Sequence, residues 1–162
     1  MPFGLRNKKE EPKSTEKIVT PDELKSFETA VYAKIPEQPI RDLVSSFIIR
    51  PSWFKEYDPQ KKLEQAEQSE KNGRIGDARL EFRAAAFAAF YQKSKLTEIC
   101  WKAYEDFLNR KKDICLGKSK DADWYFKDIK DYRELKQKPY IMDILTTTFE
   151  EFTKTLPEAG KR

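Results

Sequence analysis

The sequence predicts an all-α fold in which about six or seven antiparallel helices form stacked hairpins, as a right-handed array or a compact bundle. Glycine is scarce, with five residues among 162, whereas the helix-favouring Lys, Glu, Ala and Leu are abundant. Apolar residues recur at helical spacing along most of the chain, and no window alternates long enough with period two to predict a strand. Charged residues make up 37% and hydrophobic residues 38%, a balance that favours a thin helical layer over a thick globule.

A single helical domain is expected over residues 20–156, a length that can bury a core without disulfides or metals. Residues 1–19 are polar and poor in apolar groups, so we expect a disordered arm there. An alternative is that residues 1–5 form a short docking peptide. Residues 157–162 are expected to form a flexible tail.

The first two helices are predicted from their start signals. Thr20 and Glu23 can form a capping box around Pro21, which fits the first turn of a helix. That helix places apolar residues at helical spacing: Leu24, Phe27, Ala30 and Val31. A second helix is expected to begin near Pro39 and to end at Pro51, with an apolar stripe of Ile40, Leu43, Val44, Phe47 and Ile48.

The middle of the chain predicts a helical hairpin. Asp58 followed by Pro59 is a helix start, and Gly73 is a left-handed terminator after a helix that runs to about Asn72. The next helix is expected from residue 76 or 77 to about 93. Because residues 84–91 are apolar on every side, this helix is predicted to be central and enclosed.

Three further helices are expected, over about 96–113, over about 121–137 and after Pro139. The residues predicted to be buried on them include Ile99, Cys100, Tyr104, Phe107, Trp124, Ile129, Tyr132, Ile141, Leu145 and Phe149.

The hairpin over about 59–93 resembles a tetratricopeptide repeat. The small, turn and aromatic positions of that family are occupied by Ala66, Gly73, Ala78, Phe82 and Ala85, whereas Lys62, Ser69 and Phe90 stand where the family has Trp, Tyr and Pro. The long helix pair that ends at residues 103–108 also looks like the repeats of soluble vesicle-fusion attachment proteins, and residues 59–112 are similar to microtubule-interacting-and-trafficking domains. All three resemblances imply a surface that binds a protein segment, and none implies catalysis.

The composition argues against most enzyme chemistry. The chain has no histidine, which removes the commonest general base and the commonest transition-metal ligand. Cys100 and Cys115 lack a CxxC spacing and favour a reduced protein, although a disulfide between them stays open. No signal peptide or membrane-spanning run is evident, so a cytoplasmic protein is expected. Because the chain has no histidine and the resemblances imply binding, we expect it to be non-enzymatic and to hold no metal or cofactor.

Two acidic groups have a functional and a simpler interpretation. Glu64, Glu67 and Glu70 share a helix face that suits a divalent metal or a basic partner, but we favour a solvated face neutralised by neighbouring lysines. Asp121 and Asp123 could hold a cation, yet they fit the start of a helix better, where negative charge is favourable.

The candidate partner-binding residues are aromatic and basic. The segment before and after Pro51 contributes Arg50, Trp53, Phe54 and Tyr57, which either bind a partner or cap the hairpin core. Further candidates are Arg74, Arg79 and Arg83, for an acidic partner segment, and Trp124.

The function predicted from these features is a scaffold or adaptor that binds a peptide or partner helix between its own helices. The alternative is a nucleic-acid-associated protein that uses Lys, Arg and exposed aromatic residues, although 32 basic and 28 acidic residues are too evenly mixed to indicate nucleic-acid binding by themselves. A carboxylate-and-metal enzyme and an inactive subunit of a larger complex are the remaining hypotheses. The partner and the oligomeric state stay open.

Overall fold

The computed structural model describes residues 22–118 and 122–154. That part of the chain is all-helical, with nine α-helices and one 3-10 helix and no strand. The elements are α2 (Asp22–Ala33), α3 (Gln38–Val44), η1 (Ser45–Phe47), α4 (Pro51–Glu56), α5 (Pro59–Lys71), α6 (Ile75–Tyr91), α7 (Thr97–Arg110), α8 (Lys112–Leu116), α9 (Lys127–Lys136) and α10 (Pro139–Lys154).

The all-α prediction is confirmed, and several earlier predictions fall outside the described residues. These are the arm over 1–19, the cap at Thr20 and Pro21, Asp121, and the tail over 157–162.

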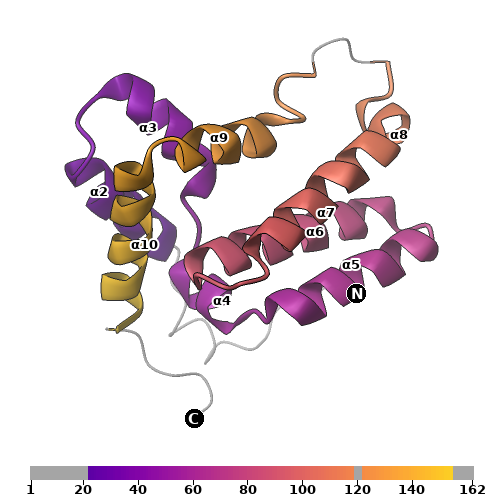
Figure 1. Cartoon of the computed structure of the whole chain (residues 1–162), viewed down its shortest axis with the longest axis horizontal. Coiled ribbons are helices and arrows are strands. Elements are labelled where there is room, and N and C mark those ends of the chain that lie inside the picture. The colour runs from indigo at the N-terminus through magenta and orange to yellow at the C-terminus, as the bar shows by residue number, and fades with distance from the viewer. Residues whose placement is uncertain (1–21, 119–121, 155–162) are drawn as a thin grey trace, which may run out of the picture.

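The helices form two groups that meet along α6 (Figure 1). In the first group α5, α6 and α7 lie side by side, with α6 packed against both of the others. In the second group α10 packs against α2 and α9. Helices α4 and α10 both contact α6. Helix α6 therefore belongs to the interior of both groups.

The α5–α6 hairpin forms where the sequence predicted it. The Asp58 carboxylate accepts hydrogen bonds from the Gln60 and Lys61 amides at 3.0 and 3.4 Å, which satisfies two donors that the start of α5 would otherwise leave free. Gly73 has φ of 78° and ends the turn in the left-handed region that glycine adopts without strain. The small residues Ala66 and Ala78 are fully buried, as expected where two helices approach closely.

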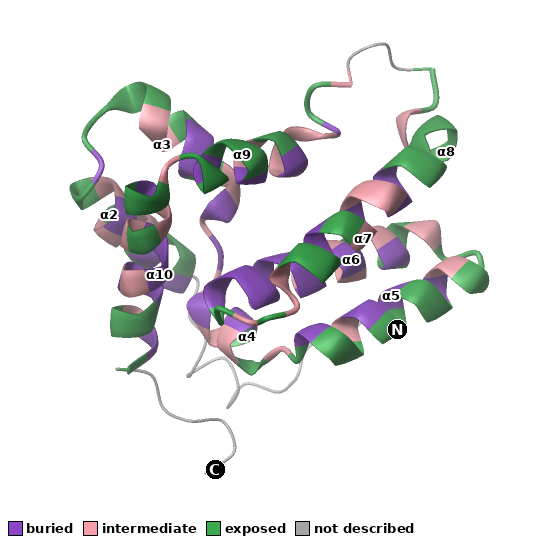
Figure 2. Ribbon diagram, in the orientation of Figure 1, coloured by how far each residue is buried: buried purple, intermediate pink, exposed green. Residues whose placement is uncertain are grey.

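The enclosed central helix is also confirmed. Every residue from Ala85 to Tyr91 is buried, and Figure 2 shows the buried faces turned toward α6. Aromatic rings from other elements surround this segment: Phe47 lies 4.8 Å from Phe87, and Phe149 stacks 4.7 Å from Tyr91. The hydrophobic core therefore follows α6.

The predicted number of helices, six or seven, is too low because Pro51 was interpreted only as an end and no break was expected within residues 96–113. The second helix was expected to end at Pro51, but Pro51 instead starts α4, since its fixed φ suits the first helical position. Arg50, which precedes it, is extended with ψ of 106°, and α3 already ends at Val44. Likewise Lys111, with φ of −107° and ψ of 18°, separates α8 from α7.

Two predicted side-chain positions are wrong. Ile99 is 57% and Trp124 is 47% exposed. Trp101, stacked 4.2 Å from Tyr132, takes the face of α7 that meets α9, and Ile99 therefore points outward. Trp124 lies in a turn before α9, and its neighbour Tyr125 is buried in its place.

Glu23, which was expected to form a capping box with Thr20, makes a contact that the sequence did not predict. Its carboxylate accepts hydrogen bonds from Ser52 at the start of α4.

Candidate functional site

A groove of about 360 Å³ lies between α4 and α6. It is lined by Ile48, Ile49 and Arg50 before α4, by Trp53, Phe54 and Tyr57 in and after α4, and by Leu80, Arg83 and Ala84 of α6. Five of the eight candidate residues predicted from the sequence are thus brought together. Arg83 is one of them, although the whole of α5 lies between it and the other four in the sequence. We call this surface the α4–α6 groove.

The rim of the α4–α6 groove is apolar and exposed. Trp53 is 46% and Leu80 is 67% exposed, and the two side chains come from different elements. Phe54 is buried beneath them and packs 5.1 Å from the Tyr57 ring. The Gln92 amide nitrogen donates to the carbonyl oxygens of Phe54 and Tyr57 at 2.8 and 2.6 Å. These bonds hold the end of α4 against α6, so the groove has a fixed floor.

Two cations lie over aromatic rings of this groove. The Arg50 guanidinium is 5.1 Å from the centre of the Trp53 ring, and the Lys62 amine is 4.3 Å from that of Tyr57. Such contacts contribute about 0.5–1 kcal/mol at exposed sites. Burial raises the pKa of Tyr57 above its ordinary value.

Arg83 connects the groove to the second group of helices. Its Nε atom lies 2.9 Å from Asp128 Oδ2, and its Nη2 atom donates to the Ser46 carbonyl at 3.2 Å. The same Asp128 oxygen accepts a hydrogen bond from the Tyr104 hydroxyl at 2.8 Å. Arg83 is therefore a structural tie between α6, η1 and α9 as well as a lining residue.

The other predicted residues lie outside the groove. Arg74 pairs with Asp77 at 3.6 Å. The Arg79 guanidinium lies 5.3 Å from the centre of the Trp124 ring and 5.4 Å from that of Tyr125. Each of these arginines thus contacts a different neighbour from Arg83.

The acidic face of α5 is partly neutralised by another helix. Arg110 of α7 binds both carboxylate oxygens of Glu70, with distances of 2.7 and 3.0 Å, and this hydrogen bonding is the main cause that lowers the pKa of Glu70. Glu64 accepts a hydrogen bond from Gln60 at 2.9 Å. In the part of the chain that the structure describes, no three acidic or cysteine side chains converge as a metal site.

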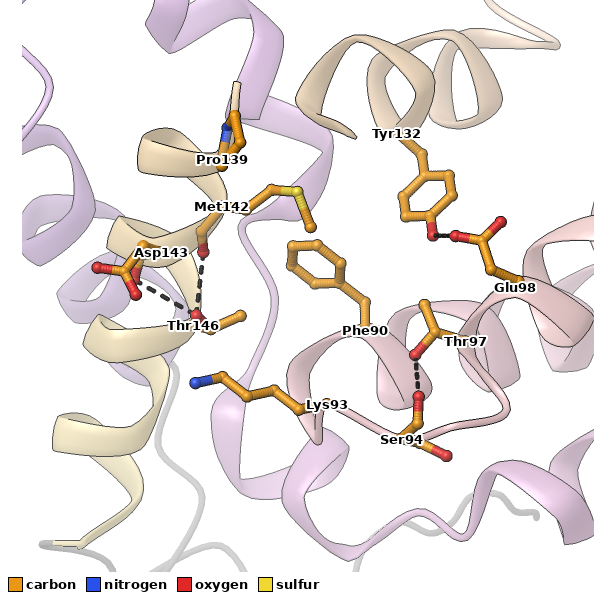
Figure 3. A pocket seen from close by; sticks show the side chains of 10 residues that line it. All are labelled: Phe90, Lys93, Ser94, Thr97, Glu98, Tyr132, Pro139, Met142, Asp143 and Thr146. Carbon is orange, nitrogen blue, oxygen red and sulfur yellow. Dashed lines mark hydrogen bonds between the residues drawn. The ribbon is translucent and has the colours of Figure 1, made fainter. Parts of the chain in front are cut away.

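A second hollow, of about 430 Å³, lies between the end of α6 and helices α7, α9 and α10 (Figure 3). The Tyr132 hydroxyl donates to Glu98 at 2.5 Å, and the Thr97 hydroxyl donates to the Ser94 carbonyl at 2.6 Å. The hydrogen bond from Tyr132 is the main cause that lowers the pKa of Glu98. Because these polar groups bind one another, the hollow offers a ligand fewer unsatisfied partners than its residue types suggest.

Leu80 is the residue of the groove that sequence reasoning missed. It stands between Arg79 and Glu81 in a charged turn of α6, where a large apolar side chain has no local packing role. This charged context was the signal that the sequence offered. The position of Leu80 beside the same groove as Trp53 depends on the tertiary fold.

In comparisons with known proteins the chain matches no family model, no curated protein and no solved structure. Each helix within residues 22–118 and 122–154 is too short or too polar to cross a lipid bilayer. Cys100 and Cys115 are both free thiols.

Proposed function

We propose that this protein is a non-enzymatic interaction module, of the tetratricopeptide-like class, which binds a segment of a partner protein in the α4–α6 groove. The observation that supports the proposal most directly is the exposure of Trp53 and Leu80 beside one groove with a buried aromatic floor. Large apolar side chains at the centre of a contact often contribute more than 1 kcal/mol each to binding. A partner side chain inserted between these two residues would remove both from water.

The choice of variants follows from the structure. Arg83→Ala is a poor test, because the substitution would also remove the contacts with Asp128 and Ser46. Trp53→Ala and Leu80→Ala remove exposed side chains and leave the core intact. Ile99→Ala is the matched control, since Ile99 is comparably exposed on α7 and does not line the groove.

The experiment is selection of short random peptides on the full-length chain, followed by measurement of their affinities for each variant. We expect Trp53→Ala and Leu80→Ala each to weaken binding about tenfold or more, with Ile99→Ala unchanged. Circular dichroism and melting curves check that each variant is folded. Peptides that bind all variants equally, or the absence of any enriched peptide, would contradict the proposal.

The second candidate function is nucleic-acid binding, which is favoured by cations stacked on exposed rings, such as Arg79 on Trp124. Successive bases can stack on such surfaces. This function requires binding of single-stranded oligothymidine that weakens steeply with added salt. We rank it second because Arg74, Arg83 and Arg110 already pair with carboxylates.

A further inference from the structure

We propose that the chain carries an occupant for its own α4–α6 groove: the apolar segment over residues 1–5, which competes there with a partner. The inference rests on the proposed function and concerns the control of access to the same groove. The place where α2 begins, the length of chain before it and the apolar side chains of the segment and of the groove support the proposal.

Helix α2 begins beside the groove. The Glu23 carboxylate accepts hydrogen bonds from the amide and the hydroxyl of Ser52 at 2.6 and 2.8 Å, and Ser52 directly precedes Trp53, which lines the groove. Glu23 is the second residue of α2, and residues 1–21 lie outside the described part of the chain. That part of the sequence is therefore attached to the molecule at a point next to the groove.

The chain before α2 is long enough to reach all of the groove. Residues 6–21 lie between the segment and Asp22, and at about 3.3–3.6 Å per residue they can bridge about 50 Å. Helix α4, which forms one wall of the groove, has six residues and a length of about 9 Å. Residues 1–5 can therefore enter the groove from the start of α2 without the displacement of any helix.

The segment places apolar side chains at the far end of a polar stretch. Pro2, Phe3 and Leu5 are followed by residues 6–17, which are polar or charged apart from Pro12. A stretch of that composition has little apolar surface to bury, whereas Phe3 and Leu5 gain free energy when they leave water. The sequence thus combines an apolar anchor with a polar linker.

The groove presents apolar surface of the kind that such an anchor needs. Trp53 and Leu80 are largely exposed at its rim, Ile48 and Ile49 belong to its lining, and its volume is about 360 Å³. An aromatic ring such as that of Phe3 can pack edge to face on the indole of Trp53 and cover Leu80. The contact would remove apolar groups of both surfaces from water.

Covalent attachment makes even a weak contact effective. A segment on a linker of this length meets its site at an effective concentration of about 1 mM. With a Kd as weak as about 0.1 mM for the segment, only about one groove in ten is open. A partner peptide then binds about tenfold more weakly than it binds an open groove. The attached segment therefore sets a threshold of affinity that a partner has to exceed.

Photochemical cross-linking tests where the segment binds. Phe3 is replaced by p-benzoylphenylalanine in the whole chain, and the cross-linked residues are identified by mass spectrometry after irradiation. We expect cross-links within one molecule to residues that line the groove, Trp53 or Leu80 among them, with a yield that does not depend on protein concentration. Cross-links to other surfaces would overturn the proposal. Cross-links between molecules would also overturn it and would assign the groove to a second copy of the chain.

Competition tests whether the segment controls access. The combined variant Phe3→Ala and Leu5→Ala should bind the peptides selected as above about tenfold more tightly than the unmodified chain. The combined variant Asn7→Ala and Ser14→Ala is the matched control, because it introduces two alanines into the same part of the sequence and removes no apolar side chain. Its affinity should not change.

The two measurements separate this inference from the proposed function. Unchanged affinity in the Phe3→Ala and Leu5→Ala variant, with binding still lost in Trp53→Ala and Leu80→Ala, would overturn the occupant within the chain and leave the groove function standing. Cross-links to the groove, together with peptide binding that is insensitive to Trp53 and Leu80, would overturn the proposed function and support the contact within the chain.

Discussion

The buried carboxylate of Glu23 provides the sharpest test of how α2 is joined to the rest of the fold. Glu23 is 5% exposed, and its two oxygens accept hydrogen bonds from the Ser52 amide at 2.6 Å and the Ser52 hydroxyl at 2.8 Å. Ser52 is the second residue of α4, and its amide has no acceptor within the helix. The carboxylate thus caps a helix that belongs to a distant part of the chain.

The expected cost of Glu23→Ala follows from these two contacts. A hydrogen bond to a charged group contributes about 1.5–3 kcal/mol. The Ser52 hydroxyl can rotate toward water, whereas its amide cannot, so we count one bond fully and the other in part. We therefore expect Glu23→Ala to lower the free energy of unfolding by about 3 kcal/mol. Glu23→Gln keeps one acceptor oxygen and should cost about half as much.

Urea unfolding followed by circular dichroism measures these differences. Glu28→Ala, on the same helix, is the control and should change stability by less than about 0.5 kcal/mol. A double-mutant cycle with Ser52→Ala isolates the hydroxyl contact and should give a coupling of about 1 kcal/mol. A loss in Glu23→Ala no larger than that in Glu28→Ala, or a coupling near zero, would refute the capping argument.

Three further predictions concern other sites. Lys93 has φ of 54°, so Lys93→Gly should relieve left-handed strain and raise stability by about 1 kcal/mol, seen as a higher Tm; a lower Tm would contradict this. The hydrogen bond from Arg110 holds the pKa of Glu70 below its ordinary value of 4.5. The stability that the Glu70–Arg110 ion pair contributes is therefore present above pH 4.5 and is lost as the pH falls through the pKa of folded Glu70. Glu70→Gln should flatten the acid limb of stability against pH, and parallel curves for the two proteins would count against the ion pair. Burial raises the pKa of Cys100 to about 11, so iodoacetamide should label Cys115 first in the native protein, as followed by mass spectrometry; equal labelling rates would be inconsistent with that burial.

The elements that could be predicted from the sequence are those whose signals are local. The cap at Asp58, the turn at Gly73 and the apolar run over 84–91 each lie within a few residues of the structure that they specify. Their physical causes act along one helix or one turn. The α5–α6 hairpin and its central helix followed from them.

The parts that could not be predicted depend on contacts between distant residues. Helical spacing allowed either Ile99 or Trp101 to face inward, and stacking on Tyr132 determines which one does. For the site, the aromatic segment around Trp53 was recognisable by composition. The neighbouring Leu80 was not, because only the packing of α4 on α6 places them beside one groove.

The position of α6 between the two helical groups has a consequence for how the molecule opens. Neither group can lose its packing without exposing apolar surface on the helix that both share, so partial unfolding of one side weakens the other. Amide protons from residue 85 to residue 91 should consequently exchange with deuterium only through the global transition, whereas those at the outer ends of α2 and α8 exchange through local fraying. Cooperative unfolding of this fold therefore depends on one helix, α6, which both groups share, and not on a continuous layer of helices.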